Sequence, residues 1–360
     1  MANVFMPSSA WFQEVVSGRT TGLRASSTRA LLAALEPVYR AVVRSKNARF
    51  DNGRSQQTDV DAPVVSVGNL TVGGTGKTPF VCWLAEWFQA HGAPVTLISR
   101  GYRAKPGQPN DEALELAARL PTVPHIQNPD RIAAAKEALE ANPRQVLLLD
   151  DAFQHRRIAR DLDIVLLDAL QPFGYDHLLP RGLLREPVEG LARAHIVALS
   201  RSDAVDEAAR AAIRRRVEAI APRAVWLELA HRPTSFVNAR AAAQRLDLEA
   251  LRGRRVAVFC GIGNPEGFRH TLTGLDLEMV DFRTFADHYS YPAESLTQME
   301  SWIRSLGSLD AVVCTQKDLV KIPRDTIAGL PLWAVEISLE ITVGKELLEA
   351  CLEPLAARVR

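Results

Sequence analysis

The chain has 360 residues, 47% of them apolar and 24% charged, so it is long enough for two globular domains and too apolar to be disordered. A net charge of +1 gives no general reason to expect a nucleic-acid partner. The four cysteines form no CxxC pair, which predicts a reducing compartment and disfavours a zinc or redox site. No uncharged apolar run is long enough to predict a clear bilayer-spanning helix.

The first fifty residues are basic and carry an amphipathic helical pattern. Seven basic residues stand there against two acidic ones, a net charge of +5. Apolar residues recur at helical spacing from Leu31 to Val42, with arginines on the remaining face, and Pro37 is expected to kink or split the helix. Two interpretations remain open: a helix lying in a membrane interface, or an ordinary amphipathic helix packed on the protein.

Residues 64–80, VVSVGNLTVGGTGKTPF, have the order of a phosphate-binding loop. A valine-rich strand leads into a glycine-rich turn and a helix start, where backbone N–H groups can face an anion. Lys77 is expected to reach the β- and γ-phosphates, and the Thr78 hydroxyl to hold Mg²⁺. The alternative is a turn that binds nothing. The predicted loop consists of Thr71, Val72, Gly73, Gly74, Thr75, Gly76, Lys77 and Thr78.

This loop departs from the common GxxxxGK[ST] pattern at one position. Thr71 stands where the pattern has its first glycine. Gly73 and Gly74 lie inside the loop and Gly68 just before it, so backbone freedom is not lacking. We therefore expect phosphate binding to be retained.

After the loop, short apolar runs alternate with helical patterns in a βαβ rhythm. The runs end in polar residues, as is typical of a doubly wound, mostly parallel sheet of the P-loop NTPase kind. The expected strands are 95–98, 146–149, 164–167 and 196–199, and a helix is expected at Arg131–Ala141.

A second block begins near Leu248 and predicts a smaller α/β domain. Its expected strands are 255–260, 311–314 and 332–337, and residues 225–236 look like an extended connection. GIGNP after the first of these strands is interpreted as a tight βα turn, because the later glycine spacing of a dinucleotide fingerprint is missing. The predicted division is an N-terminal amphipathic segment (1–50), a P-loop kinase domain (51–235) and a C-terminal α/β domain (236–360).

A nucleotide site of this kind needs an acidic group at the end of a second buried strand. The segment QVLLLDDAFQH supplies Asp150 and Asp151 there, and two adjacent carboxylates are costly unless a cation offsets their repulsion. We therefore expect them to hold Mg²⁺. A solvated turn after a strand is the alternative.

Three further groups are candidates for proton transfer or phosphate binding. Asp111 opens a helical pattern, where a carboxylate is either a base or an ordinary cap. Asp287 and His288 are an acid–base candidate pair or a surface turn. The third group lies in LPRGLLREP, a loop that either clamps phosphate or metal or is simply exposed and basic; it comprises Arg181, Arg185 and Glu186.

Taken together, these segments resemble one family, the tetraacyldisaccharide 4′-kinases of lipid A biosynthesis. The resemblance runs from about residue 30 to beyond residue 320, and DDAFQHR and RGLLREP are not general features of phosphate-binding loops. The strings that carry it, in chain order, are TVGGTGKTP, SRGYR, DEALELA, DDAFQHR, LPRGLLREP, FADHYSY and CTQKD.

The resemblance implies that the γ-phosphate of ATP is transferred to the 4′-hydroxyl of an acylated glucosamine disaccharide 1-phosphate, with Mg²⁺ required. By motif, Asp111 is implied as the base, supported by His288 with Asp287 beside it. Mg²⁺ is implied to be held by Thr78 and by the carboxylates of Asp150, Asp151 and Glu186. The residues implied to line the site further are Gln154, His155, Arg181 and Arg185.

The resemblance also implies a location and partners. The family is peripheral to the cytoplasmic face of the inner membrane, which favours an interfacial role for the N-terminal helix. The implied partners are the lipid A disaccharide precursor and the inner-membrane lipid surface, with no protein partner expected.

Two other functions compete with this interpretation. Thr315-Gln316-Lys317-Asp318 suggests a membrane-associated GTPase switch, but guanine recognition uses [NT]KxD, and here a glutamine intervenes. A P-loop kinase of a soluble metabolite is the other, for which the N-terminal helix would only pack on the domain.

Overall fold

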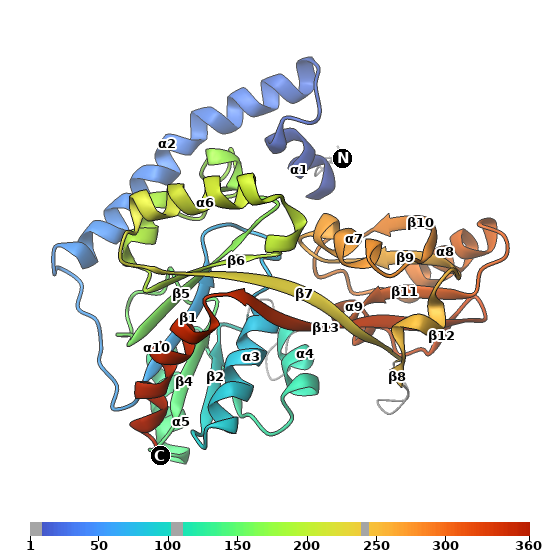
Figure 1. The fold of residues 1–360 in the computed structure, drawn as a ribbon. Coiled ribbons are helices and arrows are strands. Elements are labelled where there is room, and N and C mark those ends of the chain that lie inside the picture. Colours follow the sequence, from blue (N-terminus) through green and yellow to red (C-terminus); the bar gives the residue numbers. More distant parts are fainter. Residues whose placement is uncertain (1–8, 102–110, 239–244) are drawn as a thin grey trace. The chain divides into compact units, whose positions relative to one another are not determined.

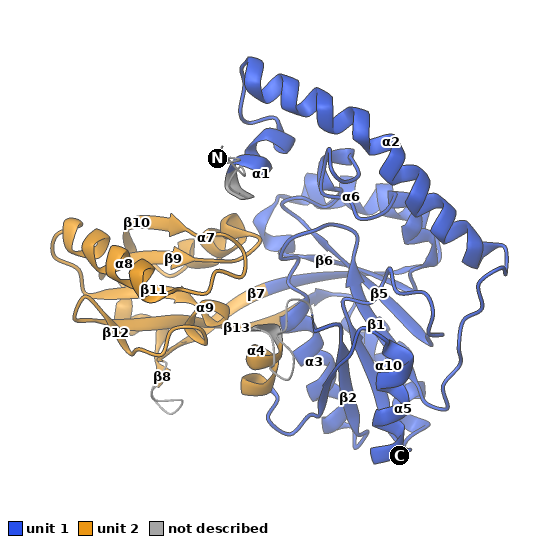
Figure 2. Cartoon of the chain, turned by 180° about the vertical axis from the view of Figure 1, so that it is seen from behind, with its two compact units in different colours: residues 1–102, 120–230, 341–360 blue, residues 103–119, 231–340 orange. Residues whose placement is uncertain are grey.

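The computed structural model describes residues 9–101, 111–238 and 245–360, and these form two compact α/β units (Figures 1 and 2). Unit 1 takes in residues 1–102, 120–230 and 341–360, and unit 2 takes in residues 103–119 and 231–340. The units therefore differ from a linear division at residues 50 and 235. The physical reason is that the long strands β7 (Val225–Val237) and β13 (Leu330–Val343) contribute residues to both units.

Unit 1 contains a parallel sheet in the strand order β7-β6-β5-β1-β4-β2-β3. The predicted strands of this sheet are confirmed, and all residues of β1, β2, β4, β5 and β6 are buried, which explains their continuous apolar runs. The strand bounds are β1 (Val64–Asn69), β2 (Val95–Ser99), β3 (His125–Gln127), β4 (Val146–Asp150), β5 (Leu162–Asp168) and β6 (Ile196–Ser200).

Strand β1 lies between β4 and β5, where the strand order of unit 1 reverses. In parallel α/β sheets, ligands bind outside the carboxyl ends of the strands at such a switch point. The loop that leaves β1 and the residues that follow β4 therefore occupy the position where a nucleotide site is expected. The strand order places the phosphate-binding loop beside Asp150 and Asp151.

The helices of unit 1 include the two N-terminal ones (Figure 1). Helix α2 continues through Pro37 as one helix, so the expectation that this proline splits the helix is wrong. No helix within the described ranges is both long enough and apolar enough to cross a bilayer. The bounds are α1 (Ser9–Ser17), α2 (Leu23–Asp51), α3 (Lys77–Ala90), α5 (Arg131–Ala141), α6 (Glu207–Ile220) and α10 (Lys345–Ala357), with short 3₁₀ turns η1 (Gly174–Asp176), η2 (Val188–Arg193) and η3 (Ser202–Ala204).

Unit 2 contains parallel strands in the order β10-β9-β11-β13, with β12 antiparallel to β13. The GIGNP segment is a tight βα turn, as predicted, since β9 ends at Cys260 and the Asn264 side chain caps α7 by accepting from Gly267 N at 2.9 Å. The bounds are β8 (Arg245–Leu246), β9 (Arg255–Cys260), β10 (Glu278–Thr284), β11 (Ala311–Thr315), β12 (Thr326–Ile327), α4 (Asp111–Arg119), α7 (Pro265–Thr273), α8 (Ala293–Ser305), α9 (Gln316–Leu319) and η4 (Leu248–Leu251).

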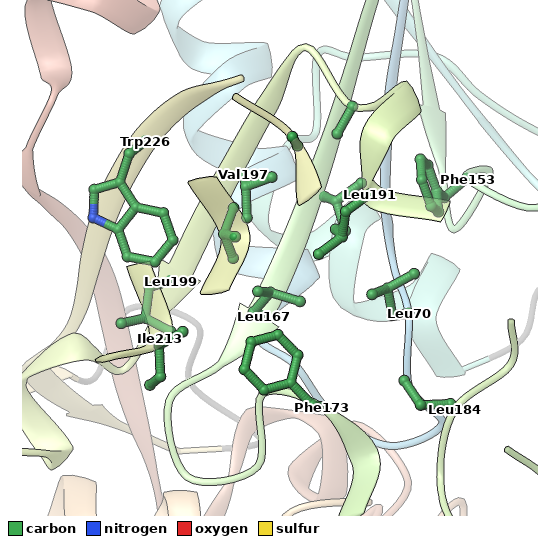
Figure 3. Close-up of a cluster of buried hydrophobic side chains, with 14 of the residues drawn as sticks. Leu70, Phe153, Leu167, Phe173, Leu184, Leu191, Val197, Leu199, Ile213 and Trp226 are labelled. Atoms are coloured by element: carbon green, nitrogen blue, oxygen red, sulfur yellow. The ribbon is translucent and has the colours of Figure 1, made fainter. Parts of the chain in front are cut away.

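A buried hydrophobic cluster in unit 1 lies along strands β5 to β7 and reaches the loops that follow β1 and β4 (Figure 3). It joins side chains from β5, β6 and β7 to side chains from the loops that follow β1 and β4. Three members, Leu70, Phe153 and Leu184, are at most 3% exposed. Each comes directly before a residue assigned to the site from sequence, and these following residues are Thr71, Gln154 and Arg185.

Gly68 in β1 provides a test of this packing. A Cβ atom at Gly68 would lie 2.6 Å from Phe153 Cβ and 2.7 Å from Phe153 N, so either the strand or the loop after β4 must shift. We expect Gly68→Ala to lower the free energy of unfolding by roughly 1–3 kcal/mol, the usual cost of overpacking. Urea unfolding of the purified variant measures it.

Gly274 provides the matched control. It has a φ of −78° and nothing within 4 Å of an added Cβ, so Gly274→Ala is expected to unfold at the wild-type urea concentration. Equal midpoints for the Gly68 and Gly274 variants would contradict the close approach of β1 to Phe153.

Candidate active site

Residues 71–78 comprise most of the turn between β1 and α3 in unit 1, together with the first two residues of α3. Gly73 and Gly76 have φ values of 113° and 81°, a backbone conformation that favours glycine. Thr71 is not among the residues with positive φ; instead it forms an antiparallel bridge with Leu184. A side chain is therefore tolerated at Thr71, which explains why this loop can lack the first glycine of the common pattern.

The polar groups of this turn are suited to an anion. Helix α3 begins at Lys77, so its unpaired N–H groups and the positive end of its dipole are at the loop. Lys77 Nζ lies 3.2 Å from Asn69 Oδ1 and 3.3 Å from Asp151 Oδ1. Thr75 Oγ1 is buried and has no hydrogen-bond partner among the described residues. A buried hydroxyl without a partner fits a phosphate oxygen.

Asp151 is a shared counterion for two of the predicted phosphate-binding cations. Arg185 Nη1 donates to both of its carboxylate oxygens, at 2.8 and 2.9 Å, while Lys77 lies on Oδ1. Burial alone would raise the pKa of Asp151, but the charges of Lys77 and Arg185 outweigh it and hold this pKa well below its usual range. Asp151 is therefore ionised at neutral pH and holds both cations beside the loop.

The oxygen donors here fit Mg²⁺. The carboxylate of Asp150 is at the end of β4 and only 5% exposed, and Thr78 lies in the first turn of α3. Within residues 9–101, 111–238 and 245–360, no group of three or more His, Cys, Asp or Glu side chains is arranged to hold a metal. One or two carboxylates completed by phosphate oxygens and water are what Mg²⁺ ordinarily uses. Thr78, Asp150 and Asp151 carry oxygen donors of this kind, and their role at Mg²⁺ remains a prediction.

Glu186 is 1% exposed and is held by three side-chain donors. Arg193 Nη2 and Asn47 Nδ2 lie 2.8 and 3.2 Å from its Oε2, and Gln154 Nε2 lies 2.9 Å from its Oε1. Gln154 also donates to the carbonyl oxygen of Asn69 at 2.9 Å. These contacts join the loop after β4, the end of β1 and the RGLLREP segment. The role of Glu186 at Mg²⁺ remains a prediction.

The other residues assigned to this site from sequence take different positions. Arg181 donates through Nη1 to the carbonyl oxygen of Val16, at the end of α1, at 3.1 Å. Burial, together with nearby arginines, lowers the pKa of His155 to about 4, so its imidazole is neutral at physiological pH. Arg181 and His155 both belong to unit 1, and their contact with nucleotide remains a prediction.

Two buried arginines near the loop were not assigned to the site from sequence. Arg201 Nη1 lies 2.8 Å from Asp168 Oδ2 and 3.2 Å from the carbonyl oxygen of Gly74, so it supports the loop directly. Arg131 is 3% exposed; burial lowers the pKa of its guanidinium, and the charges of Asp151 and Asp150 oppose that shift. The sequence signal for Asp168 and Arg201 was that a polar residue, Asp168, ends β5 and that another polar residue, Arg201, follows β6. Arg131 had none.

Unit 2 brings a second set of charged residues together. Asp287 Oδ1 lies 3.5 Å from Lys317 Nζ, and Asp287 Oδ2 lies 3.9 Å from His288 Nε2. His288 has a φ of 63°, and its N–H donates to the carbonyl oxygen of Gly261 at 3.2 Å. The predicted neighbours Asp287 and His288 are thus close, and Lys317 joins them. Their catalytic role remains a prediction.

Asp111 is the first residue of helix α4 in unit 2. The side chain of Asp111 lies outside the described part of the structure. Helix α4 packs against α9, the short helix that carries Lys317. Asp111 therefore begins a helix that contacts α9, and α9 carries Lys317, the ion-pair partner of Asp287.

Asp318 shows what the TQKD segment does in its own unit. Its carboxylate is 0% exposed and accepts hydrogen bonds from Thr315 Oγ1 at 2.6 Å, Gly261 N at 3.0 Å and Tyr291 OH at 2.9 Å. Burial raises the pKa of Asp318 more than these hydrogen bonds lower it. A carboxylate held in this way ties two strand ends to the segment containing His288 and does not resemble an exposed guanine-binding group.

The sequence was compared with known protein families and their members. The family model described as tetraacyldisaccharide-1-P 4′-kinase, LpxK, matches residues 28–356. A tetraacyldisaccharide 4′-kinase from Anaeromyxobacter sp. (strain Fw109-5) is 38% identical, covering 94% of this chain and 95% of the relative. Another, from Pseudomonas putida (strain GB-1), is 38% identical over 79% of this chain and 84% of the relative.

A solved structure gives the same result at the level of the fold. The crystal structure of the "apo" form of LpxK from Aquifex aeolicus in complex with ATP matches with a TM-score of 0.67 and 27% identity, covering 91% of this chain and 99% of that chain. The predicted fold class, a P-loop NTPase-like α/β fold with an N-terminal helix, is therefore confirmed. Because the family model matches residues 28–356, nearly the whole chain, the chain belongs to the tetraacyldisaccharide-1-P 4′-kinase family.

Proposed function

We propose that this protein transfers the γ-phosphoryl group of ATP to the 4′-hydroxyl of a tetraacyl glucosamine disaccharide 1-phosphate, a step of lipid A biosynthesis. The observation that carries the proposal is the position of Lys77 at the start of α3, paired with ionised Asp151 at the end of β4. That arrangement occurs in a chain of the 4′-kinase family, and the Aquifex relative was crystallised with ATP.

The reaction needs a nucleophile, a proton acceptor and compensation of phosphate charge. The 4′-hydroxyl oxygen attacks the γ-phosphorus, the bond between that phosphorus and the bridging oxygen breaks, and ADP leaves. The hydroxyl proton goes to a carboxylate, for which we propose Asp111, with His288 and Asp287 in support. Lys317, 3.5 Å from Asp287, keeps that carboxylate paired with a cation.

Unit 1 supplies the groups that bind the phosphates. The N–H groups of residues 71–78, Lys77 and Arg185 are proposed to contact the triphosphate, because they are the donors and cations that surround the loop. Thr78, Asp150 and Asp151 would hold Mg²⁺, with Glu186 as a further proposed ligand. Bound Mg²⁺ supplies positive charge that offsets the charge developing on the phosphate oxygens.

Lys77→Ala tests the phosphate-binding role in the full chain. We expect it to abolish transfer of labelled γ-phosphate from ATP to the lipid disaccharide in mixed micelles with Mg²⁺, because it removes the cation at the head of α3. The wild-type protein with the same acceptor is the positive control, and GTP in place of ATP tests nucleotide preference. Near-wild-type transfer by the variant, or preference for GTP, would refute the proposal.

Asp111→Ala tests the proposed base. A positioned base contributes roughly 10²–10⁴ to the rate, so kcat is expected to fall by that factor while ATP affinity stays within about twofold. The pH–rate profile is the second measurement, since loss of the base removes its ionisation from the acidic limb. A variant whose pH–rate profile matches that of the wild type would remove Asp111 from this role.

We also propose that the protein is peripheral to the inner membrane, on the cytoplasmic face where ATP is available. Helix α2 supports this, because beyond its first residue, Leu23, four more large apolar side chains on it are exposed. Their spacing places them along one side of the helix. They are Leu31, Leu35, Val38 and Val42, exposed by 63%, 48%, 65% and 63% respectively.

The double variant Leu35→Gln, Val38→Gln tests this location. Losing two side chains from the lipid phase is expected to weaken sedimentation with anionic phospholipid vesicles by more than about tenfold. ATP binding in solution is expected to stay unchanged, because both side chains are exposed on α2 and neither belongs to the groups proposed to bind the triphosphate. Wild-type sedimentation of the double variant would count against an interfacial α2.

A further inference from the structure

Helix α2 has a second side that points at the nucleotide site of its own unit. Glu36, Tyr39 and Asn47 on this side make hydrogen bonds to the segment 177–186, which contains RGLLRE. Helical spacing places Glu36 and Asn47 away from the exposed apolar row at Leu31, Leu35, Val38 and Val42, whereas Tyr39, four residues after Leu35, lies at the border between the two sides. One helix thus presents an apolar side to its surroundings and a polar side to the site.

Glu36 holds the beginning of this segment. Its carboxylate is 6% exposed; Oε1 accepts from Leu178 N at 3.1 Å, and Oε2 lies 2.9 Å from His177 Nδ1. Burial raises the pKa of Glu36, but the hydrogen bonds from Leu178, His177 and Arg40 outweigh it and lower this pKa overall. Glu36 is therefore an ionised, buried anchor at the point where the segment starts.

Tyr39 and Asn47 hold the end of the segment. The Tyr39 hydroxyl donates to the carbonyl oxygen of Arg185 at 2.9 Å, and Asn47 Nδ2 donates to Glu186 Oε2 at 3.2 Å. The body of Tyr39 also packs against the hydrophobic cluster that contains Leu184. The backbone of Arg185 is thus held from α2 by both a hydrogen bond and apolar contact.

The same segment is paired with the phosphate-binding loop. Arg185 N donates to the carbonyl oxygen of Leu70 at 2.7 Å, and Val72 N donates to that of Leu183 at 2.8 Å. The guanidinium of Arg185 meets Asp151, the counterion of Lys77. Tyr39 of α2 therefore contacts the backbone of Arg185, whose side chain is assigned to the triphosphate in the proposed function.

We propose that Tyr39 is a positioning residue of the nucleotide site: its hydroxyl fixes the Arg185 backbone so that the Arg185 side chain meets Asp151 and the triphosphate. Helix α2 is then part of the phosphate-binding architecture as well as a surface for lipid. This inference rests on the proposed function, which assigns Arg185 to the triphosphate. It assigns a role in ATP binding to a helix for which the sequence predicted only membrane association or packing.

Tyr39→Phe is the test, because it removes one hydroxyl and keeps the ring that packs on the cluster. With full-length protein, Mg²⁺ and no lipid acceptor, titration calorimetry is expected to show ATP affinity about threefold to tenfold weaker than wild type. That fold-change corresponds to about 0.7–1.4 kcal/mol, within the usual net contribution of one hydrogen bond. Tyr175→Phe is the matched control: it removes a hydroxyl that bonds Ser17 in the same unit, and its ATP affinity is expected to stay within twofold.

A second measurement separates positioning from general loss of structure. In an Arg185→Ala background, Tyr39→Phe is expected to change ATP affinity less than twofold, because its effect acts through the missing side chain. Wild-type ATP affinity of Tyr39→Phe would overturn the inference, and so would an equal loss in the Arg185→Ala background. The ATP titrations contain no lipid acceptor, so they test the role of Tyr39 separately from the transfer reaction. If the ATP affinities change as expected but the protein does not phosphorylate the lipid disaccharide, the proposed function is refuted and the inference about Tyr39 is not.

Discussion

Leu70, Phe153 and Leu184 meet in one buried hydrophobic cluster, and the arrangement of the nucleotide site depends on that contact. These side chains come from the loops after β1 and β4 and from the RGLLREP segment, which are far apart in the chain. Burial of the three apolar groups places the residues that follow them, Thr71, Gln154 and Arg185, around one loop. Apolar burial is non-directional. The directional part comes from hydrogen bonds such as that of Arg185 N to Leu70 O at 2.7 Å.

Electrostatics then determine what this loop can bind. Lys77 and Arg185 share Asp151, so the strong positive charge that a triphosphate requires is held in place by one ionised carboxylate. Because charge-assisted hydrogen bonds are stronger than neutral ones, the cations remain directed at the loop. Two further carboxylate–arginine ion pairs lie near this loop: Glu186 with Arg193, and Asp168 with Arg201. The site thus consists of paired acidic and basic side chains that pack on the buried hydrophobic cluster.

Helix α2 adds a constraint from outside the sheet. Its apolar row at Leu31, Leu35, Val38 and Val42 suits a lipid surface, while Glu36, Tyr39 and Asn47 hold the segment that pairs with the phosphate-binding loop. In the proposed function, one element would then serve both the membrane surface and the nucleotide site. The two roles are separable by substitution because none of the residues in the apolar row makes the hydrogen bonds to the segment 177–186.

Much of the fold and part of the site could be predicted from local sequence. The buried strands, the loop at 71–78 and the acidic end at Asp150 and Asp151 depend on residues that are neighbours in the chain, so short patterns reveal them. The βα turn after Cys260 was likewise predictable from GIGNP. The support of Gly74 by Arg201 and the burial of Arg131 were not, because each depends on partners brought together by folding. The linear domain division differed from the units for the same reason, since β7 and β13 supply residues to both.

The sequence by itself determined the kind of chemistry. The order of strand, glycine-rich loop, Lys-Thr and acidic strand end is local, and so is the apolar periodicity of α2. Only the tertiary structure decided that Asp151 pairs with both Lys77 and Arg185, that Glu186 is enclosed by Arg193, Asn47 and Gln154, and that Tyr39 reaches the Arg185 carbonyl. The physical reason is range. Backbone conformation and periodicity are set by adjacent residues, whereas a buried ion pair or hydrogen bond forms only where the packed core brings distant partners within about 3 Å of each other.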